Sequence, residues 1–107
     1  MNVDEYGNVL RFNVGEDISS TTNILKITGP YTSNKELILG VADGLAVGTI
    51  DISLPDGDYL ANQYVTYTFQ EGDIDIQGVW QARLSVTLSG NAARKITDKK
   101  ASFKVYP

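Results

Sequence analysis

Residues 78–88 read Gly78-Val79-Trp80-Gln81-Ala82-Arg83-Leu84-Ser85-Val86-Thr87-Leu88, and this stretch decides the fold class of the chain. From Trp80 onward, apolar and polar residues alternate; the apolar ones are Trp80, Ala82, Leu84, Val86 and Leu88. Because successive side chains of a β-strand point to opposite faces, this pattern predicts a strand with one buried face. A buried face needs a second apolar layer, and the large indole of Trp80 is a natural anchor for it.

Six more segments with strand character flank this stretch. They comprise residues 8–14, 24–28, 36–41, 64–69 and 101–106, together with a segment that begins at Leu45 or Ala46 and ends at Leu54. Turn-forming sequences such as Asp43-Gly44 and Pro55-Asp56-Gly57-Asp58 separate them. The apolar run inside residues 36–41 lacks alternation and leaves a helix open, but Gly40 follows it so closely that we expect a strand.

Together these segments predict one all-β domain over residues 1–107, an immunoglobulin-like antiparallel β-sandwich of about seven strands without a disulfide. Its core should hold the inward residues of each strand, among them Phe12, Leu25, Ile27, Val65, Tyr67, Phe69, Phe103 and Val105. Residues 18–23 are rich in side chains that hydrogen-bond the nearby backbone. We therefore expect an irregular crossing there, with Ile18 as a buried plug.

Composition excludes several kinds of chemistry. The chain has no cysteine and no histidine, so disulfides, thiolate metal sites, histidine-zinc sites and Ser-His-Asp or Cys-His catalysis are absent. We expect no cofactor. No apolar run approaches the roughly 20 residues that span a bilayer, and the opening residues 1–7 are polar and acidic, unlike a secretory signal. We therefore expect a protein made in the cytoplasm that does not bind membranes.

Charge is distributed unevenly along the chain. Residues 1–93 hold four basic and twelve acidic side chains. The tail, residues 94–107, holds one acidic side chain, Asp98, and five basic ones, Arg94, Lys95, Lys99, Lys100 and Lys104. One interpretation is a lysine-rich, solvated hairpin. The other is a charge-complementary contact, in which this basic end meets the acidic loops of a neighbouring subunit. We expect no nucleic-acid partner, because basic and aromatic residues are not interleaved on one face.

Acidic loops and tyrosines are the remaining candidates for a binding site. Asp56 and Asp58, with Glu71, Asp73 and Asp75, would offer oxygen ligands to Ca²⁺ if their two loops met. Turn capping and solubility explain these residues more simply. We do not expect a glycosidase-type pair of carboxylates, because so small a domain has little room for the sugar-binding cleft that such a pair needs. Exposed tyrosines would suit a glycan platform or a protein interface. We expect Tyr64 and Tyr106, each on the outward side of its strand, to contact other subunits.

The order of several short motifs resembles that of small immunoglobulin-like structural proteins of tailed bacteriophages. Each motif alone is common in β-sandwiches, so the resemblance depends on their order and spacing. The middle of the chain departs from the family pattern. Such proteins often have a Pro-Asp-Gly hairpin soon after the second strand, whereas here Gly29-Pro30 follows that strand and Pro55-Asp56-Gly57 comes later. The matching segments are Gly15-Glu16-Asp17-Ile18-Ser19-Ser20-Thr21-Thr22, Leu25-Lys26-Ile27, Tyr64-Val65-Thr66-Tyr67, Gly72-Asp73-Ile74-Asp75, Gly78-Val79-Trp80-Gln81-Ala82-Arg83 and Ala101-Ser102-Phe103-Lys104-Val105-Tyr106.

The resemblance implies a virion component without enzymatic activity, either a capsid decoration or cement protein or a neck, tail or baseplate accessory. Its partners would be other virion structural proteins, bound in many symmetric copies through loops, edge strands and the basic C-terminal hairpin. No catalytic residue is carried over. An alternative that remains open is a carbohydrate-binding or host-surface adhesion module.

Overall fold

The computed structural model describes residues 1–19, 21–31, 33–88 and 95–107. Within these ranges the chain is all-β, as the sequence predicts, and its one short 3-10 helix is η1 (Val41–Asp43). The described strands are β1 (Val9–Asn13), β2 (Thr21–Thr28), β3 (Glu36–Leu39), β4 (Ala46–Val47), β5 (Ile52–Leu54), β6 (Gly57–Tyr59), β7 (Tyr64–Thr68), β8 (Gly78–Leu88) and β9 (Lys95–Val105).

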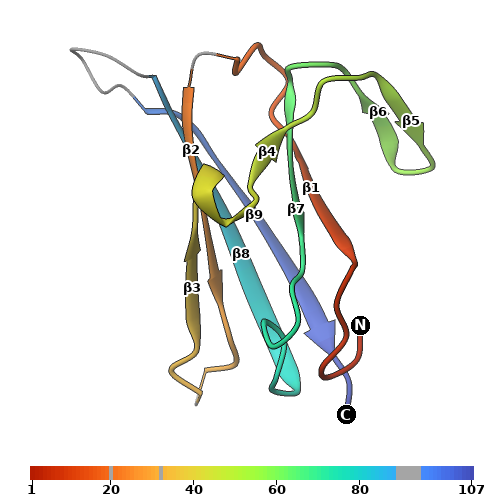
Figure 1. The fold of residues 1–107 in the computed structure, drawn as a ribbon, viewed down its shortest axis with the longest axis vertical. Helices are drawn as coiled ribbons and strands as arrows, with labels where there is room; N and C mark the ends of the chain where they lie inside the picture. The colour runs from red at the N-terminus through yellow and green to blue at the C-terminus, as the bar shows by residue number, and fades with distance from the viewer. Residues whose placement is uncertain (20, 32, 89–94) are drawn as a thin grey trace.

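The strands form two sheets and a separate hairpin. One sheet has the order β3-β2-β8-β9 and the other the order β1-β7-β4, and every strand pair within them is antiparallel. Strands β5 and β6 pair only with each other and project from one end of the molecule (Figure 1). Buried side chains of both sheets belong to one cluster, so the two sheets pack against each other around a single core.

The predicted inner face of β8 is confirmed from Trp80 to Val86, and the side chain of Leu88 lies outside the described part of the structure. Trp80, Ala82, Leu84 and Val86 are all buried, and the indole Nε1 of Trp80 donates a hydrogen bond of 2.9 Å to the Ile76 carbonyl oxygen. Burying an aromatic ring of this kind contributes about 4 to 6 kcal/mol at about 25 cal/mol per Å². Trp80 is therefore the anchor that the alternation predicts.

Aromatic rings connect the two sheets across the core. Phe69, directly after β7, packs edge-on against Tyr67 and tilts against Phe103 of β9, with ring centroids 5.6 and 5.7 Å apart. Phe103 in turn stacks on Trp80 of β8, with centroids 6.2 Å apart and ring planes 16° apart. These contacts join the β1-β7-β4 sheet to the β3-β2-β8-β9 sheet.

The N-terminal residues run alongside the end of β9. The Tyr106 N–H donates to the Met1 carbonyl oxygen and the Val3 N–H donates to the Tyr106 carbonyl oxygen, both at 2.8 Å. Met1 and Val3 pack against the core, and the two ends of the chain lie side by side (Figure 1). The first residues therefore contact their own domain.

The crossing between the sheets is shorter than the sequence predicts. Ile18 is fully buried, which confirms the plug, but β2 already begins at Thr21 and not at Ile24. The long β8 offers pairing partners out to Leu88, which is opposite Thr21. Backbone pairing along β8 thus outweighs the turn preference of the Ser and Thr residues, and Asn23 becomes a buried strand residue.

The middle of the chain is divided into more pieces than predicted. The segment expected as one strand up to Leu54 is broken, because β4 ends at Val47 and β5 begins at Ile52. The turn at Pro55-Asp56 is confirmed, but it leads into β6, which the sequence did not predict. The strand predicted over 36–41 ends at Leu39, and Val41 begins η1.

Tyr64 is on the outward side of β7, opposite the exposed Asn13, as predicted. The segment with Gly48 and Ile50 covers it, so the prediction that it contacts other subunits is wrong. Its side chain is 2% exposed, its hydroxyl donates to the Ile50 carbonyl oxygen at 2.8 Å, and its ring meets Tyr59 edge-on at 5.5 Å. The ring occupies the space beside Gly48 that any side chain there would fill. Tyr64 therefore fixes the base of the β5–β6 hairpin and takes no part in an outer surface.

Tyr67 anchors the loop between β7 and β8. Its hydroxyl donates a short hydrogen bond to Asp73 Oδ2, which also accepts the Gln70 N–H at 2.8 Å. Burial and the hydrogen bond to the carboxylate both raise the pKa of the Tyr67 hydroxyl above its ordinary value. The phenol therefore stays protonated and keeps donating to Asp73 at neutral pH.

We predict that Gly48→Ala lowers the free energy of unfolding by about 1 to 3 kcal/mol, because the added methyl group overlaps the Tyr64 ring and forces it to move. The control is Gly40→Ala, whose new methyl group meets nothing within 4 Å on extended backbone; it should stay within about 1 kcal/mol of the parent. Urea unfolding followed by Trp80 fluorescence measures both. Equal stabilities for the two variants would contradict the packing of Tyr64 on Gly48.

Candidate functional site

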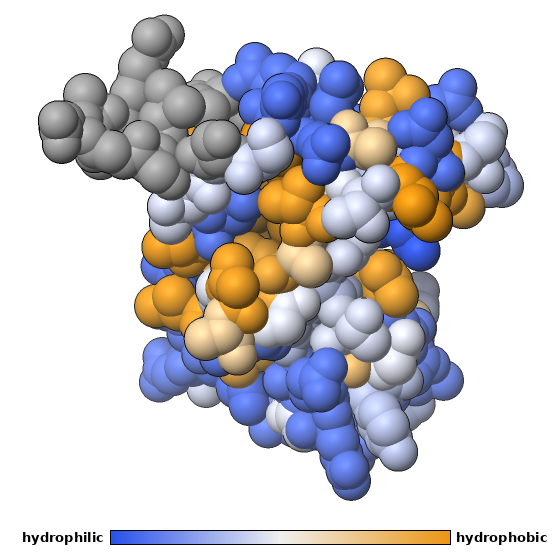
Figure 2. All heavy atoms as spheres, turned by 45° about the horizontal axis from the view of Figure 1, so that its top comes forward, coloured by the Kyte–Doolittle hydropathy of each residue, from blue (hydrophilic) through white to orange (hydrophobic). Residues whose placement is uncertain are grey.

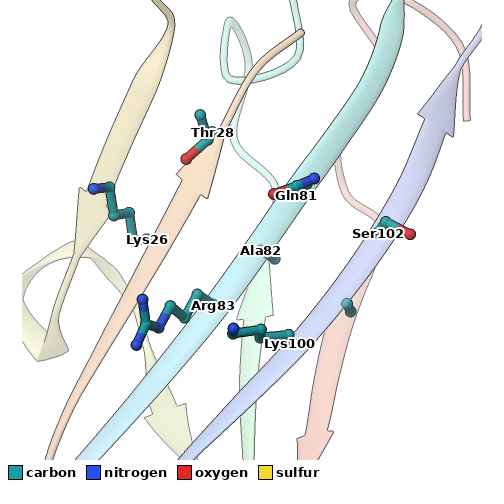
Figure 3. A pocket seen from close by; sticks show the side chains of 8 residues that line it. Lys26, Thr28, Gln81, Ala82, Arg83, Lys100 and Ser102 are labelled. Carbon is teal, nitrogen blue, oxygen red and sulfur yellow. The ribbon is translucent and has the colours of Figure 1, made fainter. Parts of the chain in front are cut away.

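Two rows of polar side chains cross the outward face of the β3-β2-β8-β9 sheet, which we call the outer face. Lys26 of β2 is opposite Arg83 of β8, which is opposite Lys100 of β9, and these three make the cationic row. One step along the strands, a polar row consists of Thr28, Gln81 and Ser102. Figure 3 shows both rows projecting from the same side of the three strands.

The cationic row sets like charges opposite one another on three neighbouring strands. Directly opposed residues of antiparallel strands have Cβ atoms about 4.5 to 5.5 Å apart, and like charges at that separation destabilise the sheet. Lys26 has one partner, Glu36, at 3.4 Å, but both side chains are about half exposed, so the pair is weak. The row therefore concentrates positive charge at an exposed part of the sheet, where a partner can reach it.

The rows border open hollows on the outer face. A hollow of about 460 Å³ is lined by both rows (Figure 3), and Ala82 and Ala101 also line it. A second hollow of about 510 Å³ shares Thr28 and Gln81 with the first and continues toward Pro30, Tyr31 and Val79. The outer face is therefore concave and continuous, with a cationic end and an aromatic, apolar end.

Exposed apolar side chains adjoin the cationic row on the β3 side. Ile38 of β3 is opposite Lys26 and is 63% exposed, and Val41 of η1 is 79% exposed. Ile24, two positions before Lys26 on β2, is also exposed. Figure 2 shows hydrophobic side chains at the surface on the side that carries β3 and η1. Apolar groups next to charged ones are typical of protein-binding surfaces.

The structure divides the predicted interface residues. Lys100 belongs to the cationic row, and Lys104 is also outward, opposite Val79, with its Nζ 5.3 Å from the centre of the half-exposed Tyr106 ring. Lys99 is opposite buried Leu84 and so points toward the other side of β9. Lys95 is the first residue of β9 and its backbone is opposite Thr87 of β8, whereas Arg94 lies outside the described residues.

Sequence reasoning missed Lys26 and Arg83. Both occupy outward positions in the alternation of their own strands, which was the available signal. Their alignment with Lys100 depends on the register between β2, β8 and β9, which local patterns do not contain.

The two acidic loops do not meet. Asp56 and Asp58 are on the projecting β5–β6 hairpin, whereas the β7–β8 loop with Glu71, Asp73 and Asp75 lies at the opposite end of the sheets (Figure 1). Asp75 pairs with Lys35 at 3.3 Å. Among the described residues, no three carboxylates gather closely enough to hold a metal ion. A Ca²⁺ site shared between these loops is therefore excluded.

Comparisons of the chain with protein-family models, with curated proteins and with solved structures returned no match. In the part of the chain that the structure describes, no helix is long and apolar enough to cross a bilayer. A functional assignment therefore depends on the sequence motifs and on the outer face.

We predict that Lys100→Glu raises the free energy of unfolding by about 0.2 to 1 kcal/mol at low salt, because it places a carboxylate opposite Arg83. Screening should remove most of this gain at about 1 M NaCl, where the Debye length is about 3 Å. Ser102→Glu is the control, since its opposite residue is the neutral Gln81. Urea unfolding at both salt concentrations provides the measurement. Destabilisation by Lys100→Glu at low salt would show that the row carries no like-charge cost.

Proposed function

We propose that this protein is a non-enzymatic structural component of a tailed-bacteriophage virion, where it binds other virion proteins in many copies. The observation that carries the proposal is the order of the motifs from Gly15–Thr22 to Ala101–Tyr106, which resembles small immunoglobulin-like virion proteins. Two packed antiparallel sheets with a buried tryptophan on a central strand agree with an immunoglobulin-like sandwich. The β5–β6 hairpin falls in the middle segment, where the motif order departs from the family pattern.

The chemistry of the outer face supports binding over catalysis. Its hollows are lined by cations, hydroxyls and an amide, and the sequence has no histidine or cysteine to act as base or nucleophile. A Ser-Lys pair would need a desolvated lysine to accept a proton. Lys100, the lysine of the row on the same strand as Ser102, is exposed. The open, charged surface is suited to holding another protein.

The edges of the four-stranded sheet are poorly suited to pairing with a neighbour. Strand β3 has four residues, and β9 carries Lys99 on its core side and Lys100 and Lys104 on its outer side. Short edge strands and inward-pointing charges are the usual protection against edge-to-edge pairing. We therefore assign assembly to the outer face and the loops.

A mass-spectrometric inventory of purified virions of the encoding phage tests the proposal. We expect the chain to be present, with a copy number that is constant relative to the major capsid protein after repeated washing at low salt, which preserves contacts between charged surfaces. Hundreds of copies per particle, an order set by capsid symmetry, indicate a decoration or cement protein on the capsid. A few to a few tens, on the order of one tail ring, indicate the neck, tail or baseplate. Complete absence from washed particles contradicts a virion role.

A carbohydrate-binding module is the second candidate, and Tyr31 is the observation that favours it. Its side chain is fully exposed beside the hollow that holds Thr28 and Gln81, so an aromatic face and hydrogen-bonding groups adjoin each other. Were this the function, Tyr31→Ala would abolish specific binding on a glycan array, and Tyr6→Ala, at another exposed tyrosine, would not. No specific binding by the wild-type chain removes this candidate and favours the structural role.

A further inference from the structure

The β5–β6 hairpin has the shape and composition of a docking element. It projects beyond both sheets (Figure 1), and its exposed acidic residues are Asp51, Asp56 and Asp58, with no basic residue between them. Ile50 is 64% exposed and Leu60 is 48% exposed at its base. Figure 2 shows hydrophobic groups beside hydrophilic ones on this projecting part. A two-stranded hairpin is marginally stable alone, so a projecting one with uncovered apolar residues is suited to a partner.

The base of this hairpin is held in place. The Tyr64 hydroxyl binds the Ile50 carbonyl oxygen, the Ala61 N–H donates to Asp51 Oδ1 at 2.7 Å, and Asn13 Nδ2 donates to the Asp58 carbonyl oxygen at 3.1 Å. Within the hairpin, Asp58 accepts from the Ser53 hydroxyl at 2.7 Å. A preorganised element loses less conformational entropy when it binds, so its affinity for a partner is higher.

The hairpin and the outer face are complementary in both charge and polarity. Lys26, Arg83, Lys100 and Lys104 are on the outer face, where Glu36 pairs with Lys26. By register Asp98 of β9 is opposite Ser85, so cations still outnumber acidic residues there. The acidic hairpin carries apolar Ile50 and Leu60 at its base, and the cationic row adjoins an apolar group of Ile24, Ile38 and Val41. The two surfaces thus differ in the sign of their charge, and both carry exposed apolar side chains that a contact would bury.

We infer that the chain self-associates head to tail, with the β5–β6 hairpin of one copy seated on the outer face of the next. The biological role of this contact rests on the proposed virion function, but the contact itself is a property of the isolated chain. Because the two surfaces differ, the interface is heterologous, and repetition of it generates a ring or an open array. A second copy fits better than nucleic acid, because a net charge of -4 and the acidic hairpin repel phosphates.

Charge reversal on each surface tests the inference. The face variant is Lys26→Glu with Lys100→Glu, and the hairpin variant is Asp56→Lys with Asp58→Lys. Sedimentation velocity over a concentration series should show wild-type mass rising above the 11.7 kDa monomer. Each variant alone should associate at least about tenfold more weakly, and so should the wild type when salt rises from about 0.05 to 0.5 M. Circular dichroism confirms that both variants are folded.

Mixing the two variants provides the decisive result. The acidic outer face of the face variant then meets the basic hairpin of the hairpin variant. The unchanged hairpin of the first and the unchanged outer face of the second also match, so the mixture should regain wild-type association. A misfolded variant cannot produce this rescue. Lys99→Glu is the control: it reverses one lysine next to Lys100 that points to the other side of β9, and it should associate like the wild type.

Three results would overturn the inference: a wild-type chain that stays monomeric, variants that associate like the wild type, or a mixture without rescue. A monomeric chain whose outer face binds an oligonucleotide or an acidic glycan would replace it with another partner. The virion inventory separates this test from the proposed function. A chain present in particles but monomeric in solution overturns the head-to-tail contact alone, whereas a self-associating chain absent from particles overturns the virion role alone.

Discussion

The contact of Phe69 with Phe103, and of Phe103 with Trp80, is the interaction on which the rest of the structure depends. It joins a residue next to β7 to residues of β9 and β8, and so holds the two sheets together across the core. With no disulfide in the chain, burial of these rings and of the aliphatic residues around them supplies the main stabilisation. The long β8–β9 pair is positioned by this packing.

The outer face is a consequence of the same packing. A strand that points Trp80, Ala82 and Leu84 inward must point Gln81 and Arg83 outward. The register that stacks Phe103 on Trp80 also sets Lys100 opposite Arg83, so the core determines the alignment of the cationic row. The surface charges are therefore held by rigid strands, which is the arrangement that suits a specific partner.

Two features of the chain direct any assembly away from simple edge pairing. The β9 edge is protected by lysines on both faces, whereas the β5–β6 hairpin leaves the sheets altogether and is fixed at its base by Tyr64. The acidic hairpin and the cationic row are separate surfaces of one small domain. Positive and negative charge are thus separated in space, which favours oriented contacts over random aggregation.

The sequence by itself determined the all-β class and the buried row of Trp80, because the alternation of apolar and polar residues is visible among neighbouring residues. It also determined the buried Ile18, which is a lone apolar residue among turn-forming ones. Only the tertiary structure decided that the outward Tyr64 is covered, since its ring packs against Gly48 in another segment. The cationic row likewise needed three strands in register. Register follows from packing over a whole sheet, and short-range patterns carry no record of it.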